Sequence, residues 1–126
     1  MKYPIKEAFE AKEMSYAPYS EFKVGAALLC GDGSVYKGCN IENSSYSATI
    51  CAERAAVAAA VADGKRDFVA IVITGGEDYC YPCGICRQFL GEFVDDKFKI
   101  ILAKSETELK IYKMSELMPH SFSLEK

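Results

Sequence analysis

The chain has 126 residues, a formal net charge of −3 at pH 7 and 50% hydrophobic residues, and its 15 basic residues are scattered. This length suits a single domain with a substantial core, so we expect residues 1–126 to form one domain. Nucleic-acid backbones are bound by clustered Lys and Arg, and membranes are spanned by apolar runs of about 18–20 residues, neither of which is present. We therefore expect a cytoplasmic protein that acts on a small molecule, with neither nucleic acid nor a membrane as a partner.

The first half of the chain predicts a helix followed by a β-hairpin. Residues 4–16 have the apolar spacing of an amphipathic helix. Residues 22–30 are apolar and of strand length, and the tight-turn sequence at 31–34 predicts an antiparallel return along 35–39. Residues 40–50 are polar, lack a clear period and are predicted to form a loop.

The second half predicts alternating helices and strands. A strand–helix–strand succession requires parallel pairing with a right-handed crossover, whereas the first hairpin adds an antiparallel pair. We therefore predict an α/β fold with a mixed five-stranded sheet and helices on both faces. The predicted elements are helices at 51–62, 84–94 and 114–118, and strands at 68–74, 98–103 and 109–112, the last at an edge.

Two cysteine clusters fall where predicted helices begin, which is where ligands lie in open α/β sheets. Cys83 and Cys86 are three residues apart and so share one face of a helix. Cys51 and Glu53 are two residues apart, which in mid-helix separates them by about 200° around the axis. These two side chains can cooperate only at the end of a helix.

The clusters predict a zinc ion held by Cys51, Cys83 and Cys86 with one coordination position free, which is the catalytic arrangement. Glu53 is then a candidate proton carrier. Three thiolates leave Zn²⁺ with a net charge of −1, so compensation is expected. Two helix N-termini would supply part of it, and Arg54 and Gln88 are candidates to donate hydrogen bonds to ligand sulfurs.

Other interpretations of the cysteines remain open at this point. Cys80 could complete a closed, structural four-cysteine site with no catalytic role. Cys83 and Cys86 alone could form a thioredoxin-like redox pair. Cys30 and Cys39 lie at apolar strand positions that favour core thiols, and His120 is predicted to lie at the surface.

The paired motifs Cys51-Ala52-Glu53-Arg54 and Pro82-Cys83-Gly84-Ile85-Cys86-Arg87-Gln88 resemble the zinc site of the cytidine deaminases. The resemblance extends from Ala17-Pro18-Tyr19-Ser20 to Phe122 and is closest to the small homotetrameric enzymes that act on free cytidine and deoxycytidine. Asn40-Ile41-Glu42-Asn43 narrows it to nucleoside enzymes. It implies a three-layer α/β/α sandwich, a zinc cofactor, and a homotetramer in which neighbouring subunits complete each site.

The same resemblance implies hydrolysis of cytidine and 2′-deoxycytidine to uridine and 2′-deoxyuridine plus ammonia, in pyrimidine salvage, with Glu53 carrying protons. It also implies contacts with the substrate. These are Phe22 with the base or sugar, Asn40 and Glu42 with the ribose 3′-hydroxyl, the Ala52 backbone and Glu53 with the cytosine edge, and Phe122, Tyr46 and Ser44 with the site of a neighbouring subunit.

Three residues depart from the usual pattern of that family, namely Ser44, Tyr81 and Ile85, and they leave the substrate range open. A deaminase of blasticidin-type nucleoside antibiotics is the nearest alternative, although the ribose motif at residues 40–43 argues against it. Editing of nucleic acid conflicts with the acidic composition.

Overall fold

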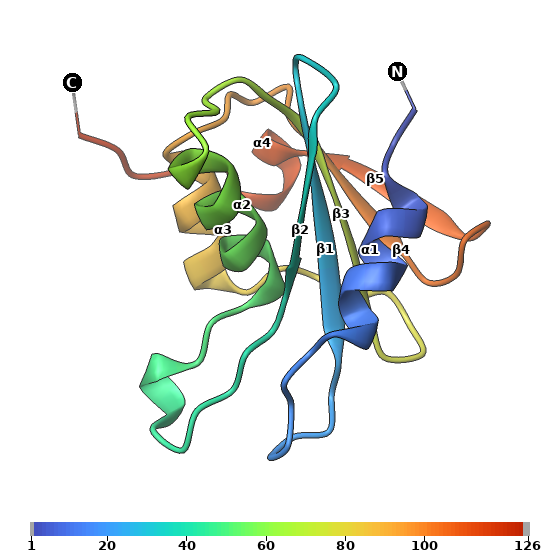
Figure 1. The fold of residues 1–126 in the computed structure, drawn as a ribbon. Coiled ribbons are helices and arrows are strands. Elements are labelled where there is room, and N and C mark those ends of the chain that lie inside the picture. The colour runs from blue at the N-terminus through green and yellow to red at the C-terminus, as the bar shows by residue number, and fades with distance from the viewer. Residues whose placement is uncertain (1, 125–126) are drawn as a thin grey trace.

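A five-stranded sheet with the strand order β2-β1-β3-β4-β5 forms the centre of the computed structural model, which describes residues 2–124 (Figure 1). Only β3 and β4 pair in parallel, and the other neighbours are antiparallel. The predicted mixed sheet is therefore confirmed, including its antiparallel first hairpin. The strands are β1 (Val24–Cys30), β2 (Val35–Cys39), β3 (Phe68–Gly75), β4 (Lys99–Ala103) and β5 (Leu109–Lys113).

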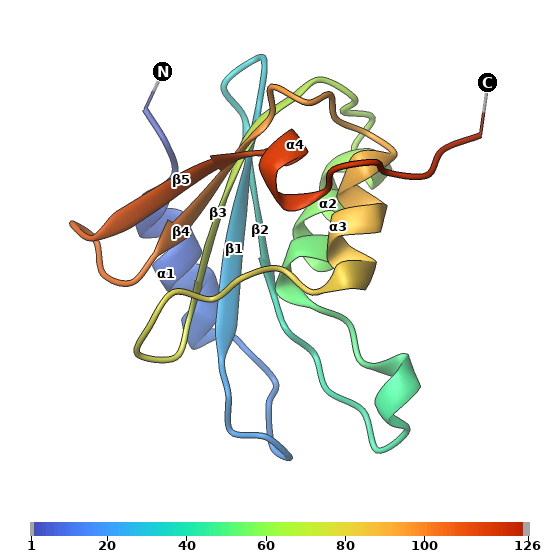
Figure 2. The same cartoon turned by 180° about the vertical axis from the view of Figure 1, so that it is seen from behind.

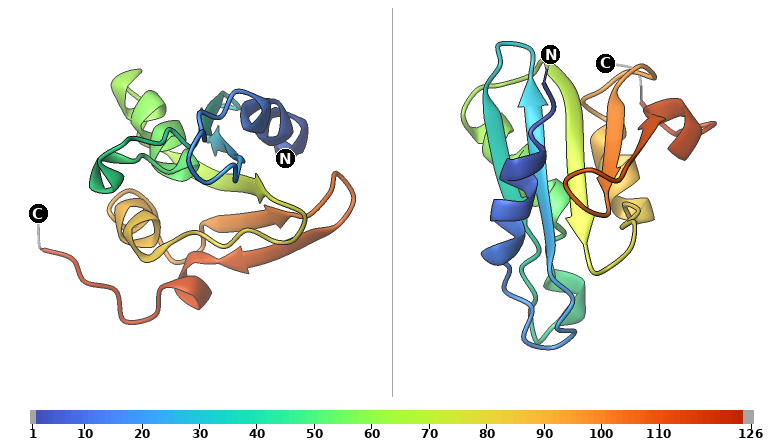
Figure 3. Two further views of the ribbon diagram at one scale, coloured as in Figure 1. Left: turned by 90° about the horizontal axis from the view of Figure 1, so that it is seen from below. Right: turned by 90° about the vertical axis from the view of Figure 1, so that its right-hand side faces the viewer.

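Helices cover both faces of this sheet, as predicted (Figures 1 and 2). On one face α1 packs through Ala8 against Ala27, Val72 and Ile101 of the sheet. The other face carries the larger core and is covered by the remaining helices. Seen end-on, α1 lies across the sheet from α3 (Figure 3). The helices are α1 (Ile5–Glu13), α2 (Ala52–Ala62), α3 (Gly84–Gly91) and α4 (Met114–Leu117).

The central strands are apolar because both of their faces are covered. Every residue of β1 is buried, as are all but one of β3. Such continuous apolar runs are typical of strands between two helical layers. Among residues 2–124, no helix has both the length and the apolar character needed to cross a bilayer.

Several boundaries differ from the sequence prediction. The first strand begins at Val24 and not at Phe22, because the Phe22 carbonyl accepts a hydrogen bond from the Asn40 side chain instead of entering the sheet. Helix α1 ends at Glu13, and α3 ends at Gly91. The predicted loop at 40–50 contains one turn of 3₁₀ helix, η1 (Tyr46–Ala48).

Gly38 in β2 allows the start of α2 to lie directly on the sheet. A Cβ at this position would lie 2.4 Å from both the Ala52 carbonyl oxygen and the Ala56 nitrogen. Backbone atoms cannot yield to such a contact as a flexible side chain can. The absence of a side chain at Gly38 therefore sets the distance between α2 and the sheet, and with it the position of Cys51.

Candidate active site

Cys51 and Cys83 are the N-cap residues of α2 and α3, with extended backbone conformations. Their sulfurs lie 3.8 Å apart, and the sulfurs of Cys83 and Cys86 lie 3.4 Å apart. All three sulfurs fall within 4.8 Å of one another. The Cys86 backbone N–H, in the first turn of α3, donates to the Cys83 sulfur. Two helix starts thus bring three thiols to one point.

This donor set fits zinc. Tetrahedral zinc with Zn–S distances of about 2.3 Å holds its sulfurs about 3.8 Å apart. The observed separations of 3.8 and 3.4 Å are close to that spacing. Hydrogen bonds from Cys86 and then from Arg54 lower the pKa of the Cys51 thiol to about 5, so this group is a thiolate at neutral pH. Soft thiolate ligands are those that zinc prefers.

Arg54 lies beside the cluster from the first turn of α2. Its Nη2 lies 3.7 Å from the Cys51 sulfur and 3.1 Å from the Thr49 carbonyl oxygen, to which it donates. The first of these contacts places a positive charge next to the Cys51 sulfur. The hydrogen bond to Cys51 is the main cause of a raised pKa of Arg54.

Gln88 has a different partner from the one the sequence suggested. Its side-chain amide donates to the Phe122 carbonyl oxygen over 3.1 Å and not to a ligand sulfur. Gln88 lies in the second turn of α3, where the tail of the chain passes within reach. This amide therefore ties the C-terminal segment to the helix that carries Cys83 and Cys86.

Glu53 is buried, with 4% of its surface exposed. It lines a cavity of about 180 Å³ together with Ala52, Cys51 and Cys83. Burial raises the pKa of this carboxyl group. A raised pKa moves a carboxyl group toward the range in which it can act as a general acid as well as a general base. The cavity thus places a proton carrier next to the thiols.

Cys80 also lines this cavity, but its sulfur is not part of the three-sulfur group. It packs against the larger core, and burial raises the pKa of its thiol to about 11. This geometry disfavours the closed four-cysteine site.

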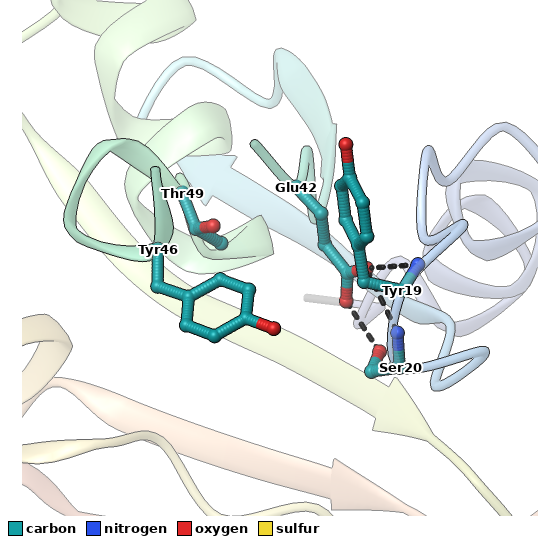
Figure 4. Close-up of a pocket in the computed structure, with 5 residues that line it drawn as sticks. All are labelled: Tyr19, Ser20, Glu42, Tyr46 and Thr49. Carbon is teal, nitrogen blue, oxygen red and sulfur yellow. Dashed lines mark hydrogen bonds between the residues drawn. The ribbon is translucent and has the colours of Figure 1, made fainter. Parts of the chain in front are cut away.

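A second cavity of about 360 Å³ adjoins the first through Thr49, which lines both. Glu42 lies on its wall, where its carboxylate faces the backbone of Tyr19 and Ser20, while Tyr46 projects toward it from η1 (Figure 4). The Glu42 Oε1 accepts hydrogen bonds from the Tyr19 and Ser20 nitrogens at 3.0 and 3.1 Å, and Oε2 accepts one from the Ser20 hydroxyl. These bonds lower the pKa of Glu42, so its carboxyl group is ionised.

Asn40 also binds the segment that precedes β1. Its side-chain oxygen accepts from the Val24 nitrogen at 3.0 Å, and its side-chain nitrogen donates to the Phe22 carbonyl at 2.8 Å. Phe22 itself is 47% exposed, and its ring packs where a Cβ on Gly76 would otherwise lie. The side chains of Asn40 and Glu42 therefore fix the backbone between Tyr19 and Val24.

Of the remaining candidate residues, only Tyr81 lines the cavity that contains Glu53. The Ser44 hydroxyl lies 2.7 Å from that of Tyr19, and Tyr81 pairs in the same way with Tyr112 at 2.8 Å. Ile85 is exposed, and Phe122 is 68% exposed. Neither Phe122 nor Ile85 lines the cavity that contains Glu53.

Sequence reasoning missed three residues that shape the site. Ser20 and Thr49 line the second cavity. Arg87 donates to the Pro82 carbonyl, next to Cys83, and to the Leu117 carbonyl, both at 2.9 Å. Ser20 had a local signal, because a Ser hydroxyl often accepts from the backbone two residues later. Arg87 and Thr49 act through tertiary contacts that no local pattern reveals.

Three thiols at two helix starts, with a buried glutamate lining the same cavity, are the arrangement of the zinc-dependent nucleobase deaminases. The family profile described as "Cytidine and deoxycytidylate deaminase zinc-binding region" matches residues 1–102. The chain belongs to this family of zinc-dependent deaminases.

Individual relatives match this chain in sequence over nearly its full length. The cytidine deaminase of Sporosarcina psychrophila is 46% identical over 122 residues, covering 96% of this chain and 90% of that protein. The enzyme of Halalkalibacterium halodurans is 47% identical, with 96% and 92% covered. The crystal structure of cytidine deaminase from Burkholderia pseudomallei superposes with a TM-score of 0.89 at 41% identity, covering 94% of this chain and 95% of that one. The predicted fold class is thereby confirmed.

Proposed function

We propose that this chain forms a single domain over residues 1–126 and is a cytoplasmic cytidine deaminase of pyrimidine salvage. It would hydrolyse cytidine and 2′-deoxycytidine to uridine and 2′-deoxyuridine, with water adding at C4 of the base and ammonia leaving. The observation that carries the proposal is the buried Glu53 in one cavity with the sulfurs of Cys51 and Cys83. Relatives that are 46 and 47% identical bear the name cytidine deaminase.

Cys51, Cys83 and Cys86 would hold the zinc ion, since their sulfurs lie within 4.8 Å of one another. Bound zinc would polarise a water molecule and make it a nucleophile at neutral pH. Arg54 would stabilise the thiolate of Cys51 through the contact at 3.7 Å.

Glu53 would carry protons through the reaction. It takes a proton from the attacking water and gives it to N3 of the cytosine. It then takes the proton of the new C4 hydroxyl group and gives it to the departing amine, so that C4 becomes a carbonyl and ammonia leaves. Burial raises the pKa of its carboxyl group, which allows the group to hold a proton between these steps. The backbone of Ala52, which lines the same cavity, would contact the edge of the base.

Asn40 and Glu42 would hold the ribose 3′-hydroxyl. Glu42 accepts three hydrogen bonds from the protein, which leaves room for about one more of the roughly four that a carboxylate accepts. Asn40 retains one N–H donor after binding Phe22. Together they offer one acceptor and one donor, which a hydroxyl group can satisfy at once. Phe22 would pack against the base or sugar.

The decrease in ultraviolet absorbance on conversion of cytosine to uracil tests the proposal. The zinc-loaded protein is assayed with cytidine, 2′-deoxycytidine, blasticidin S and single-stranded oligo-dC. We expect turnover of the two free nucleosides alone. Turnover confined to blasticidin S or to the oligonucleotide would overturn the assignment, as would a protein that binds zinc tightly but deaminates none of the four.

We further propose a homotetramer in which Phe122, Tyr46 and Ser44 reach a neighbouring site. All three are exposed in the single chain, and Phe122 is 68% exposed. The test compares truncation after Ser121 with truncation after Phe122, using light scattering and steady-state kinetics. We expect only the shorter protein to show a raised KM and a weakened tetramer. Identical behaviour of the two truncations would make Phe122 a bystander.

A further inference from the structure

The Ser20 hydroxyl joins two residues of the proposed nucleoside site. It donates to Glu42 Oε2 (Figure 4) and accepts a hydrogen bond from the Phe22 backbone N–H at 3.0 Å. One rotatable oxygen therefore satisfies the carboxylate on one side and the backbone at Phe22 on the other. Among residues 2–124, no other side-chain donor reaches Oε2 of Glu42.

The other bonds of Glu42 do not fix its orientation. The backbone nitrogens of Tyr19 and Ser20 both bind Oε1. A carboxylate held through one oxygen can still rotate about that anchor, which changes where Oε2 points. The Ser20 hydroxyl supplies the second anchor. It thereby fixes the oxygen that has capacity left for a ligand.

We infer that Ser20 is a positioning residue for nucleoside binding, which orients Glu42 Oε2 and the backbone at Phe22 for the sugar. This inference rests on the proposed function. Ser20 does not contact Glu53 or the three thiols among the described hydrogen bonds, and it lines the second cavity and not the first. Its loss should therefore weaken substrate binding and leave the chemical step intact.

The test compares Ser20→Ala with Ser20→Thr, which keeps the hydroxyl. Ser105→Ala is the matched control, because the Ser105 hydroxyl also accepts backbone N–H groups, those of Thr107 at 3.3 Å and Glu108 at 3.1 Å, in a turn distant in sequence. We expect Ser20→Ala to raise KM for cytidine about 5- to 20-fold and to leave kcat within about twofold of the wild-type value. The reason is that the lost charge-assisted hydrogen bond would stabilise the bound substrate and the transition state equally. Zinc content should not change in any variant. Ser105→Ala should behave as wild type, and Ser20→Thr should recover most of the binding that Ser20→Ala loses.

A second measurement asks whether Ser20 acts through Glu42. In the wild type, 3′-deoxycytidine should bind more weakly than cytidine, and Ser20→Ala should reduce this difference. In a double-mutant cycle with Glu42→Gln, the two effects on KM should be non-additive. Hydrogen exchange of the Phe22 amide should be faster in Ser20→Ala than in Ser20→Thr. This measurement reports the hydrogen bond from the Phe22 N–H to the Ser20 hydroxyl and does not depend on enzyme activity.

An unchanged KM, an additive cycle, or equal exchange of the Phe22 amide in both Ser20 variants would each overturn the inference. A fall in kcat that accompanies loss of zinc would also overturn it, because the role would then be general stability. Failure of the proposed function looks different, since the wild-type protein itself would then turn over no cytosine nucleoside.

Discussion

The sulfurs of Cys51 and Cys83 lie 3.8 Å apart although 32 positions separate the two residues in the chain. Each residue caps a helix, and both helices pack on the same face of the sheet. The fold thus brings two helix N-termini, each with a partial positive charge, to one group of thiols.

Replacement of Glu53 by Gln should abolish turnover without loss of the metal. The amide keeps the shape of the side chain but cannot carry a proton, so kcat should fall by about 10²- to 10⁴-fold. Glu106→Gln, an exposed position in the turn between β4 and β5, is the control and should behave as wild type. Zinc is measured by atomic emission alongside the kinetics. A Glu53→Gln enzyme with substantial activity would remove this residue from the mechanism.

Replacement of Arg54 by Ala should weaken zinc binding. The change removes the donor that lies 3.7 Å from the Cys51 sulfur, and loss of an outer partner of a ligand typically costs about 10- to 100-fold in metal affinity. Arg66→Ala is the control, because Arg66 donates to the Val61 and Lys65 carbonyls and to no sulfur. Competition with a chromophoric chelator gives both affinities. Equal affinity in the two variants would count against charge compensation by Arg54.

Cys80 should be resistant to alkylation at neutral pH. Burial raises the pKa of its thiol to about 11, and a thiolate is the reactive form. The rate of modification by iodoacetamide should therefore rise about tenfold per pH unit up to that value. Because the fold favours the neutral thiol, the contribution of Cys80 to stability is present below its ordinary pKa of 9.0 and is lost as the pH rises toward 11.

Peptide mass spectrometry of the zinc-loaded protein measures the modification, and Cys80→Ser confirms the assigned peptide. This variant should bind as much zinc as the wild type. Loss of the metal in Cys80→Ser would instead support the closed four-cysteine site.

A side chain at Gly38 should displace α2. The Cβ of Gly38→Ala would meet two backbone atoms of that helix at 2.4 Å, and overpacking of this kind costs about 1–3 kcal/mol or more. Gly84→Ala is the control, since a Cβ there meets nothing within 4 Å. Urea unfolding of both variants gives the comparison, and zinc affinity should fall only in Gly38→Ala. Equal stabilities would show that α2 can shift without cost.

The mixed five-stranded sheet and the place of the thiols at helix starts were accessible from sequence because both follow from local patterns. Apolar runs such as residues 68–74 predict covered strands, and a strand–helix–strand succession dictates parallel pairing. The angular argument for Cys51 and Glu53 needs only the helical repeat. These features depend on periodicity, and periodicity is visible in a single chain.

The partners of polar side chains were not accessible in this way. Phe22 is apolar enough for a strand, yet it is excluded because Asn40 takes its carbonyl. Gln88 is near enough to Cys86 in sequence to suggest a sulfur contact, but its amide is bound by the tail at Phe122. Each choice depends on which distant backbone group lies within 3 Å or so after folding, and no local rule encodes that.

The capping of two helices by ligands of one ion has a consequence for folding. A metal that joins Cys51 to Cys83 links two helix starts that are 32 positions apart in the chain, and it can do so only when both helices are in place. Since only the folded chain presents all three sulfurs together, the stability of the protein should follow the free zinc concentration. The ion would thus fasten one end of α2 and α3, and a cell short of zinc would hold less of the folded protein as well as less of the active enzyme.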